Sequence, residues 1–337
     1  MTIWTIICAI IMFCILVLVH EGGHFIAAKS VGVKVNEFAV GMGPVLLKKV
    51  RGETQYSLRL FPIGGFCAME GEDDQSEDER SFGKRPLWAK AIIIVAGSFM
   101  NLVLAVIVMA GIILYLGIPT TSISGFSDVS PAEAAGIHTG DKIVSIQQQE
   151  VKSWTDITEA ISAVQGETVT IGVDRQGQQL NFTMDLTQEE DTGRKIIGIL
   201  PDVSRNPFTA LIKGAEATKL LAVQMVEVIG QLVSGDVSTK ELTGPIGITK
   251  AVSDSVKYGY VYVANLAALI SLNLAIVNML PFPALDGGRL LFLIIRKVTG
   301  RAITDDMEAK VHFIGIMLLF ALMIYVTWQD IGRFILN

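Results

Sequence analysis

Long apolar runs alternate with polar segments along this chain. Four of the runs are long enough to cross a bilayer, which takes about 20 mainly apolar residues per helix. They cover residues 3–28, 87–117, 260–280 and 311–327, each to within a few positions. The first run has no small-residue cleavage site and is too long for a signal peptide that is removed. The pattern therefore predicts a polytopic α-helical membrane protein with four transmembrane helices.

A further apolar segment, residues 207–235, differs from these four. Its apolar positions recur at helical spacing, but Lys213, Glu216 and Lys219 interrupt them. This pattern is typical of an amphipathic helix that lies on a surface or in the membrane interface. We therefore assign 201–259 to an amphipathic linker region between a first membrane part, 1–117, and a second membrane part, 260–337.

Short strand and helix patterns in residues 118–200 predict a separate small α/β domain. A short helix is expected at 131–135, followed by a turn at Gly136, and TGD at 139–141 leads into an expected strand at 142–146. A second helix is expected at 154–164, with strands at 168–173 and 179–184.

The composition fits a membrane protein and disfavours several other classes. Of the 337 residues, 51% are hydrophobic and 18% are charged, and the mean hydropathy is +0.51. Soluble domains carry about 25% charged residues, so a disordered chain or an ordinary cytosolic enzyme is disfavoured. The net charge of −6 provides no basic field for nucleic acid. Three cysteines cannot build a disulfide framework.

The distribution of Lys and Arg predicts the orientation in the membrane. The loop 29–86 holds nine of them and the short loop 289–310 holds five, whereas the tail 328–337 holds one. Short basic loops stay in the cytoplasm, so we expect the segment 118–259 and both termini outside. The acidic run at 70–80 is expected to be a solvated loop, or alternatively a lid over the site.

The first predicted span contains HEGGH at residues 20–24. A helix places His20 and His24 on one face, where they can bind Zn²⁺ with Glu21 beside them as the general base. A charged side chain at bilayer depth costs about 2.5–3.5 kcal/mol, which favours this role over a polar cluster that only packs helices. Gly22 and Gly23 indicate room near the metal or close helix packing.

A catalytic zinc usually takes three protein ligands, and Asp286 is the best candidate for the third. The first and third spans should both end on the cytoplasmic side, which brings Asp286 to the depth of the two histidines. We expect prolines at 281 and 283 to break the helix there, and Gly287–Gly288 to allow a turn. The alternative is an aspartate that caps a restarting helix. His138, in the outer domain, and His312, at a helix start, are weaker candidates.

Asn273 and Asn278 lie in the third span, where an asparagine needs a partner. They either bond to neighbouring helices or bind the backbone of a substrate helix that has unwound. The second alternative fits peptide hydrolysis inside the membrane. Zinc would lower the pKa of water toward about 7 and polarise the scissile carbonyl. Glu21 would take up the proton and return it to the leaving amine.

These motifs carry a resemblance to a known family. HEGGH at 20–24 and the NxxPxPxLDGG pattern at 278–288 are its core, with supporting matches at 41–44, 61–66, 96–101 and 243–248. The chain resembles the site-2 protease family of intramembrane zinc metalloproteases, most closely its bacterial RseP/RasP-like branch. The resemblance implies that His20, His24 and Asp286 hold the zinc and that Glu21 is catalytic.

The resemblance also implies how substrate is held. The loop 29–86 would form a membrane-associated β-hairpin or small sheet on the cytoplasmic side. Its stretch 61–66, which includes Gly64 and Gly65, would lie near an edge that clamps an extended substrate. Asn273 and Asn278 would help to hold that substrate.

The order of elements in 118–200 resembles a circularly permuted PDZ domain, present once here and twice in the best-known relative. A PDZ domain binds an extended terminus by strand addition, and we expect its groove along residues 123–126. The alternative is a steric filter that excludes proteins with large outer domains.

The implied function is zinc-dependent intramembrane proteolysis in the cytoplasmic membrane of a bacterium. Its substrates would be single-span proteins, such as anti-sigma-factor-like regulators, or remnant signal peptides, after trimming by an upstream site-1-type protease. One alternative is a non-catalytic membrane adaptor that carries a PDZ domain, but a scaffold has no need of Glu21. A metal transporter should show repeated halves, and no repeat is visible.

Overall fold

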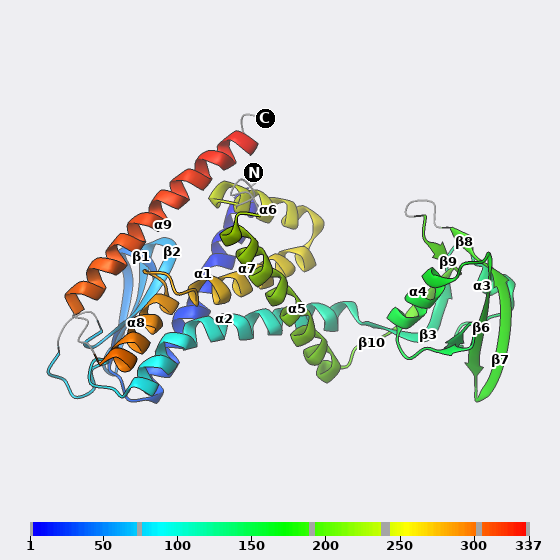
Figure 1. Cartoon of the computed structure of the whole chain (residues 1–337), viewed down its shortest axis with the longest axis horizontal. Helices are drawn as coiled ribbons and strands as arrows, with labels where there is room; N and C mark the ends of the chain where they lie inside the picture. Colours follow the sequence, from blue (N-terminus) through cyan, green and yellow to red (C-terminus); the bar gives the residue numbers. More distant parts are fainter. Residues whose placement is uncertain (1–2, 73–75, 189–192, 237–242, 301–304, 335–337) are drawn as a thin grey trace. The chain divides into compact units, whose positions relative to one another are not determined.

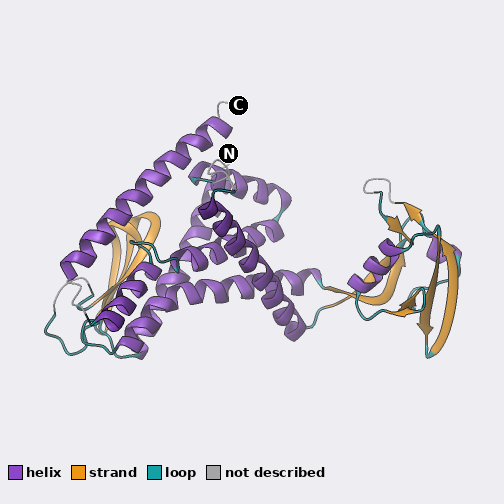
Figure 2. Cartoon of the chain, in the orientation of Figure 1, coloured by secondary structure: helices purple, strands orange, loops and turns teal. Residues whose placement is uncertain are grey.

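The computed structural model describes residues 3–72, 76–188, 193–236, 243–300 and 305–334 (Figure 1). The chain forms two compact units. The first unit combines residues 1–112 with residues 211–337, and the second unit is residues 113–210. Figure 2 shows that long helices dominate the first unit, whereas strands dominate the second.

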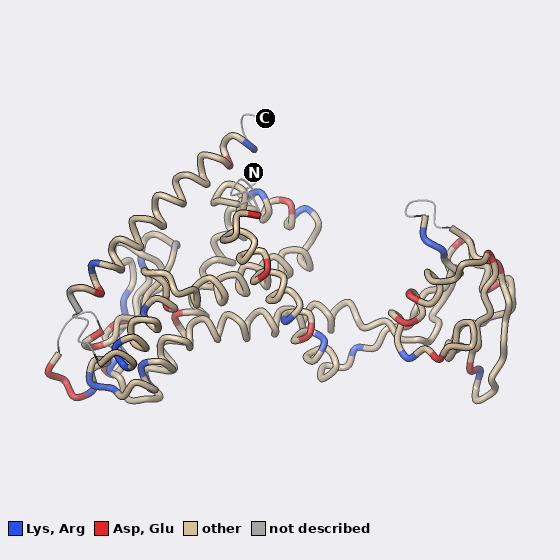
Figure 3. The backbone as a smooth tube through the Cα atoms, in the orientation of Figure 1, with Lys and Arg blue, Asp and Glu red and all other residues tan. Residues whose placement is uncertain are grey.

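Four helices of the described chain are long and apolar enough to cross a membrane. They are α1 (Ile3–Ser30), α2 (Leu87–Leu116), α7 (Tyr260–Asn278) and the Met307–Phe334 part of α9 (Asp305–Phe334). At most 33% of the apolar window of each helix is buried inside the protein, so most of these apolar side chains need a lipid environment. Figure 3 shows how few charges these helices carry over most of their length. The structure thus confirms a polytopic helical membrane protein with four candidate spans.

Helix α5 (Pro207–Ser234) covers the predicted amphipathic segment and is not one of these candidate spans. It packs tightly on α2, because a Cβ atom added at Gly214 would lie 2.7 Å from the backbone nitrogen of Ala110.

The sequence pattern did not predict helix α6 (Pro245–Tyr258) within the linker region. The first turn of α6 is held by another helix, since the backbone N–H of Gly247 donates a 2.8 Å hydrogen bond to Asp330 Oδ2 of α9. The residue that accepts this N-terminal hydrogen bond of α6 lies 83 positions away in the sequence. A local sequence pattern therefore does not reveal the start of α6.

Strands β1 (Val35–Arg51) and β2 (Thr54–Met69) form a long antiparallel hairpin after α1. The hairpin is folded over, because Val40 of β1 pairs with both Leu58 and Gly65 of β2. The early part of β1 therefore lies between two parts of β2, and the segment 64–69 has no partner strand beyond it among the described residues. Gly65 packs on α1, since a Cβ atom there would lie 3.0 Å from Val17 Cγ1.

Part of the acidic run 70–80 is held by specific contacts. Glu70 accepts hydrogen bonds from Ser76, Asn36 and Lys34, at 2.6, 3.0 and 3.1 Å. These contacts, that of Ser76 first, lower the pKa of Glu70 to about 2. Glu70 departs from the expected solvated loop because side chains from before β1, from β1 and from the loop surround its carboxylate, whereas Glu77 and Glu79 are exposed as expected. Residues 73–75 of the run lie outside the described residues.

The chain reverses between α7 and α8 (Asp286–Thr299). The prediction of a turn at Gly287–Gly288 is wrong, because both glycines lie in the first turn of α8. The backbone turns earlier, where Ala284 has a φ of 79°. The glycines are needed for close approach, since a Cβ atom at Gly288 would lie 2.2 Å from the carbonyl oxygen of Phe282.

The second unit is a sheet with two short helices. The strand order is β10-β3-β4-β6-β7, and β5 pairs with β4. Its isoleucine-rich core includes residues 123, 137, 143, 146, 157 and 171, all at most 1% exposed. The elements of this unit are β3 (Ile118–Phe126), α3 (Pro131–Ala134), β4 (Lys142–Ile146), β5 (Gln149–Glu150), α4 (Trp154–Ala163), β6 (Thr168–Arg175), β7 (Gln178–Asp185) and β10 (Ile199–Ser204), together with the separate short pair β8 (Thr187–Gln188) and β9 (Lys195–Ile196).

The strand order of this unit corrects the predicted groove. Residues 123–126 belong to β3, which is paired on both sides, with β10 and with β4. Strand β10 occupies one edge of residues 123–126, and Ile123 is bonded to residues 140 and 141 on the other edge, so a groove along the β10 edge of this stretch is excluded. A cavity of about 750 Å³ instead lies between α4 and residues 194–200, where β10 ends the described sheet.

Candidate metal centre

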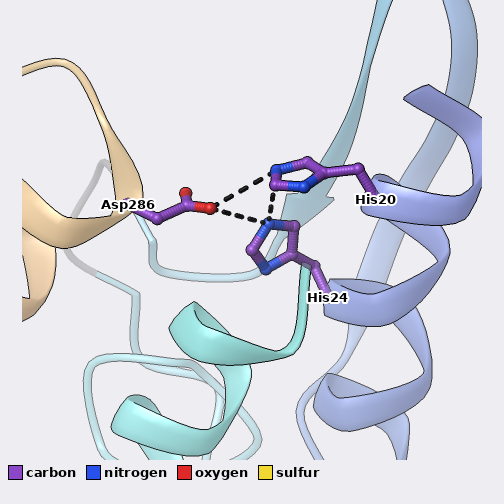
Figure 4. A group of neighbouring side chains, drawn as sticks. All are labelled: His20, His24 and Asp286. Atoms are coloured by element: carbon purple, nitrogen blue, oxygen red, sulfur yellow. Dashed lines mark hydrogen bonds and ion pairs between the residues drawn. The ribbon is translucent and has the colours of Figure 1, made fainter. Parts of the chain in front are cut away.

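His20, His24 and Asp286 converge on one point in the first unit (Figure 4). The two histidines project from the same face of α1, four residues apart, and Asp286 is the first residue of α8. His20 Nε2 lies 3.3 Å from both His24 Nε2 and Asp286 Oδ2, and His24 Nε2 lies 3.5 Å from Asp286 Oδ2. The chain reversal after α7 therefore places the carboxylate of Asp286 next to the imidazoles of His20 and His24.

The donor set fits a zinc ion. Two imidazole nitrogens and one carboxylate oxygen are a common ligand set of catalytic zinc sites, which leave a coordination position open. Asp286 Oδ2 is buried without a well-formed hydrogen bond, although it faces both histidines. A buried carboxylate oxygen in that situation needs a cation or a donor. A Zn²⁺ ion held by His20, His24 and Asp286 would satisfy this need.

Helix α2 packs against the imidazole rings of His20 and His24. The carbonyl oxygen of Ile93 lies 2.8 Å from His24 Nδ1. One helical turn further, a Cβ atom at Gly97 would lie 2.3 Å from His24 Nε2 and 2.8 Å from His20 Cε1. Only glycine leaves room for both rings at this position.

Glu21 lies beside the metal-facing residues, on the side of the β-hairpin. A Cβ atom at Gly65 of β2 would lie 3.4 Å from Glu21 Cγ. The carboxylate-bearing side chain is therefore placed between the histidine face of α1 and the segment 64–69.

The structure separates the two asparagines of the third span. Asn278 lies at the end of α7 with Nδ2 3.4 Å from His20 Nε2, so it borders the site. Asn273 is exposed. Five residues along a helix correspond to a rotation of about 140°, so the two side chains face different directions.

The two remaining histidines have other surroundings. His312 Nδ1 accepts a 2.8 Å hydrogen bond from the backbone N–H of Ala284, which ties α9 to the turn before Asp286. His138 is exposed in the second unit. Neither belongs to the group of metal-facing residues found in the described chain.

Sequence reasoning assigned no role to three residues around the site. Gly97 and Asn101 line the histidines, and the only sequence signal was the AGSFMN match at 96–101. Arg289 forms an ion pair with Glu72 beside a cavity of about 540 Å³ that both residues line. These two residues are 217 positions apart, so no local pattern could connect them.

Comparison with known proteins decides the family. The model of peptidase family M50 matches residues 8–322. The chain belongs to peptidase family M50.

Two relatives align with this chain over 98% of its length. This M50 chain is 36% identical to a putative zinc metalloprotease of Clostridium acetobutylicum, with 98% of each chain covered. It is 30% identical to the regulator of sigma-W protease RasP of Bacillus subtilis, over 98% of this chain and 99% of that protein. The latter alignment spans 418 positions, so RasP carries insertions relative to these 337 residues. The M50 chain is thus a zinc metalloprotease of the site-2 type, an enzyme of the membrane.

Solved structures of PDZ domains match about a quarter of this chain. The PDZ domain of an SdrC-like protein from Listeria monocytogenes matches 25% of this chain and 86% of its own, at 28% identity and a TM-score of 0.21. A second PDZ domain, from Listeria innocua, matches with 28% identity and a TM-score of 0.23.

Proposed function

We propose that this M50 protease hydrolyses peptide bonds in or near the transmembrane segments of single-span membrane proteins. Anti-sigma-factor-like regulators and remnant signal peptides are the proposed substrates, after trimming by an upstream site-1-type protease. The observation that carries the proposal is the convergence of His20, His24 and Asp286 among helices that need a lipid environment. The relative from Bacillus subtilis, whose name is regulator of sigma-W protease RasP, supports a regulatory substrate.

Each residue of the site has a proposed role. His20, His24 and Asp286 hold the zinc, and Glu21 is the general base that accepts a proton from the attacking water. Zinc, when bound, supplies Lewis-acid activation of the water and of the scissile carbonyl. Glu21 then returns the proton to the leaving amine, which restores its carboxylate.

The β1–β2 hairpin could bind the substrate as an additional strand. A peptide bond inside a transmembrane helix is shielded by its own hydrogen bonds, so the helix must unwind and find new partners. The segment 64–69 lies beside Glu21 and lacks an outer partner strand in the described chain. An extended substrate that adds to this edge, at Gly64 and Gly65, would have its backbone satisfied next to the base. The position of Asn278 beside His20 supports a role for its side chain in holding this backbone, whereas the exposed Asn273 faces a different direction.

The distribution of charge supports an active site near the cytoplasmic side of the cell membrane. Figure 3 shows Lys and Arg gathered with Asp and Glu around α8 and the loop before α2. The first of these, α8, comes directly after α7, and the loop before α2 comes after the β1–β2 hairpin that follows α1. The second unit would then be an extracytoplasmic PDZ-like domain. Its cavity beside the unpaired side of β10 would receive an extended terminus, or its bulk would act as a size filter.

The test separates metal binding from catalysis. The purified wild-type protein is compared with Glu21→Gln and Asp286→Asn for zinc content and for cleavage of a single-span reporter in the same samples. Glu21→Gln should retain about one zinc per chain and lose at least about 10²-fold in cleavage rate. Asp286→Asn should lose both zinc and activity.

Two outcomes would contradict the proposal. Cleavage by Glu21→Gln at the wild-type rate would remove Glu21 as the base. A wild-type protein that binds zinc and cleaves no membrane segment, while it binds peptides through the second unit, would favour the adaptor.

A further inference from the structure

A single stripe of helix α2 lies behind both metal-facing histidines. Ile93, Gly97 and Asn101 are spaced four residues apart, so they share one face of the helix. Ile93 contacts His24, Gly97 lies against both rings, and Asn101 contacts His20. Ile93 and Asn101 therefore each contact the Nδ1 atom of one ring, whereas the Nε2 atoms of both rings face Asp286.

The contact to His24 fixes the proton of that ring. The carbonyl oxygen of Ile93 can only accept a hydrogen bond, so His24 Nδ1 must donate the 2.8 Å bond between them. The lone pair of the neutral ring is then on Nε2, the atom that faces Asp286. His24 is thus preset in the tautomer that a metal requires.

His20 needs an equivalent partner, and Asn101 is positioned to be it. Its amide nitrogen Nδ2 lies 3.4 Å from His20 Nδ1. Asn101 is fully buried, at 0% exposure, and its Oδ1 has no hydrogen-bond partner in the described chain. A half-turn of the amide exchanges the oxygen and the nitrogen. It brings the unsatisfied acceptor Oδ1 to His20 Nδ1, where it can accept the hydrogen bond of the ring N–H.

We infer that Asn101 is a positioning residue of the zinc site, whose Oδ1 accepts the Nδ1 proton of His20 and thereby directs the Nε2 lone pair to the metal. Hydrogen bonds of this kind orient a ligating imidazole and raise its basicity. The backbone of Asn101 is itself fixed, because Ser271 of α7 donates a 2.7 Å hydrogen bond to its carbonyl oxygen. This inference rests on the proposed ligand set.

The test measures zinc affinity by competition with a chromogenic chelator, for the full-length protein in detergent. Asn101→Leu removes the acceptor at similar volume and should weaken zinc binding about 10–100-fold. Asn101→Asp keeps an acceptor oxygen and should bind zinc within a few-fold of wild type. Ser98→Ala is the matched control, because the Ser98 hydroxyl is also buried on α2 without a partner in the described chain, and it should leave the affinity unchanged.

Two results would overturn the inference. The first is unchanged affinity in Asn101→Leu. The second is an equal loss in Asn101→Asp and Asn101→Leu, since this would assign the amide a donor or packing role. The variant His20→Ala tests the ligand set independently of Asn101. If it leaves zinc affinity unchanged, the ligand set itself fails. If His20→Ala loses zinc and Asn101→Leu does not, only the role of Asn101 fails.

Discussion

At the scale of single residues, the two glycines of HEGGH have different surroundings. A Cβ atom at Gly23 would lie 2.3 Å from the carbonyl oxygen of Ala96 and 2.9 Å from Met100 Cγ. A Cβ atom at Gly22 would meet no atom within 4 Å. Gly23 is therefore the residue that lets α1 and α2 approach closely, and this approach sets both histidines against α2.

This difference predicts opposite effects of the same substitution. Gly23→Ala should separate α1 from α2, with an overpacking cost of about 1–3 kcal/mol and weaker zinc binding. Gly22→Ala should be neutral or slightly stabilising, because alanine favours a helix by up to about 1 kcal/mol over glycine. Thermal unfolding and zinc content of the two variants check this. Equal loss in both would show that the close approach at Gly23 is not what the motif requires.

His20, His24 and Asp286 could be proposed from sequence because they lie in two short motifs, at residues 20–24 and 278–288. His20 and His24 share a helix face, and Asp286 follows from the depth of two span ends. Asn101 was not predicted, because its partner lies 81 residues away and an asparagine in an apolar helix fits many roles. Asn273 and Asn278 could not be told apart, since the helix phase relative to α1 is a tertiary property.

At the scale of elements, α9 supports the turn that presents Asp286. A Cβ atom at Gly315 would lie 2.5 Å from the carbonyl oxygen of Pro283, whereas a Cβ atom at Gly332 of the same helix would meet nothing within 4 Å. Gly315→Ala should push α9 away from the turn, lower the unfolding temperature and speed zinc release. Gly332→Ala is the matched control and should change neither. Chelator-induced zinc loss measures the effect, and equal rates in the two variants would contradict this role of α9.

Elements with a long apolar run could be predicted from the sequence. Elements that depend on contacts with residues far away in the sequence could not. The four long apolar helices follow from composition over about 20 residues. Helix α6 depends on Asp330 for its first turn, and the start of α8 depends on carbonyl oxygens that only glycines can approach. Gly287–Gly288 looked like a turn in sequence because a preference for turns and a need for close packing select the same residue.

At the scale of the whole molecule, the number of helices that cross the membrane decides on which side each segment lies. Helix α2 separates the loop that holds Glu79 from the second unit, and α7 separates the second unit from α8. If α2 and α7 cross the membrane and α5 does not, then residue 79 and residue 297 lie on one side. Residue 178 of the second unit lies on the other side.

Single cysteines test this arrangement. The variants Glu79→Cys, Gln178→Cys and Lys297→Cys replace exposed side chains, in a chain whose native Cys8, Cys14 and Cys67 are changed to alanine. The basic loops predict that a membrane-impermeant maleimide labels position 178 from outside intact cells, and positions 79 and 297 only after the cells are opened. Labelling of 297 together with 178 would make α5 a fifth span. In that case α8 would lie outside, His20 and Asp286 would sit at opposite ends of the bilayer, and the metal centre could not form. If α1, α2 and α7 each cross the membrane, the contacts of Asp286 with His20 and His24 therefore predict that α5 does not cross it.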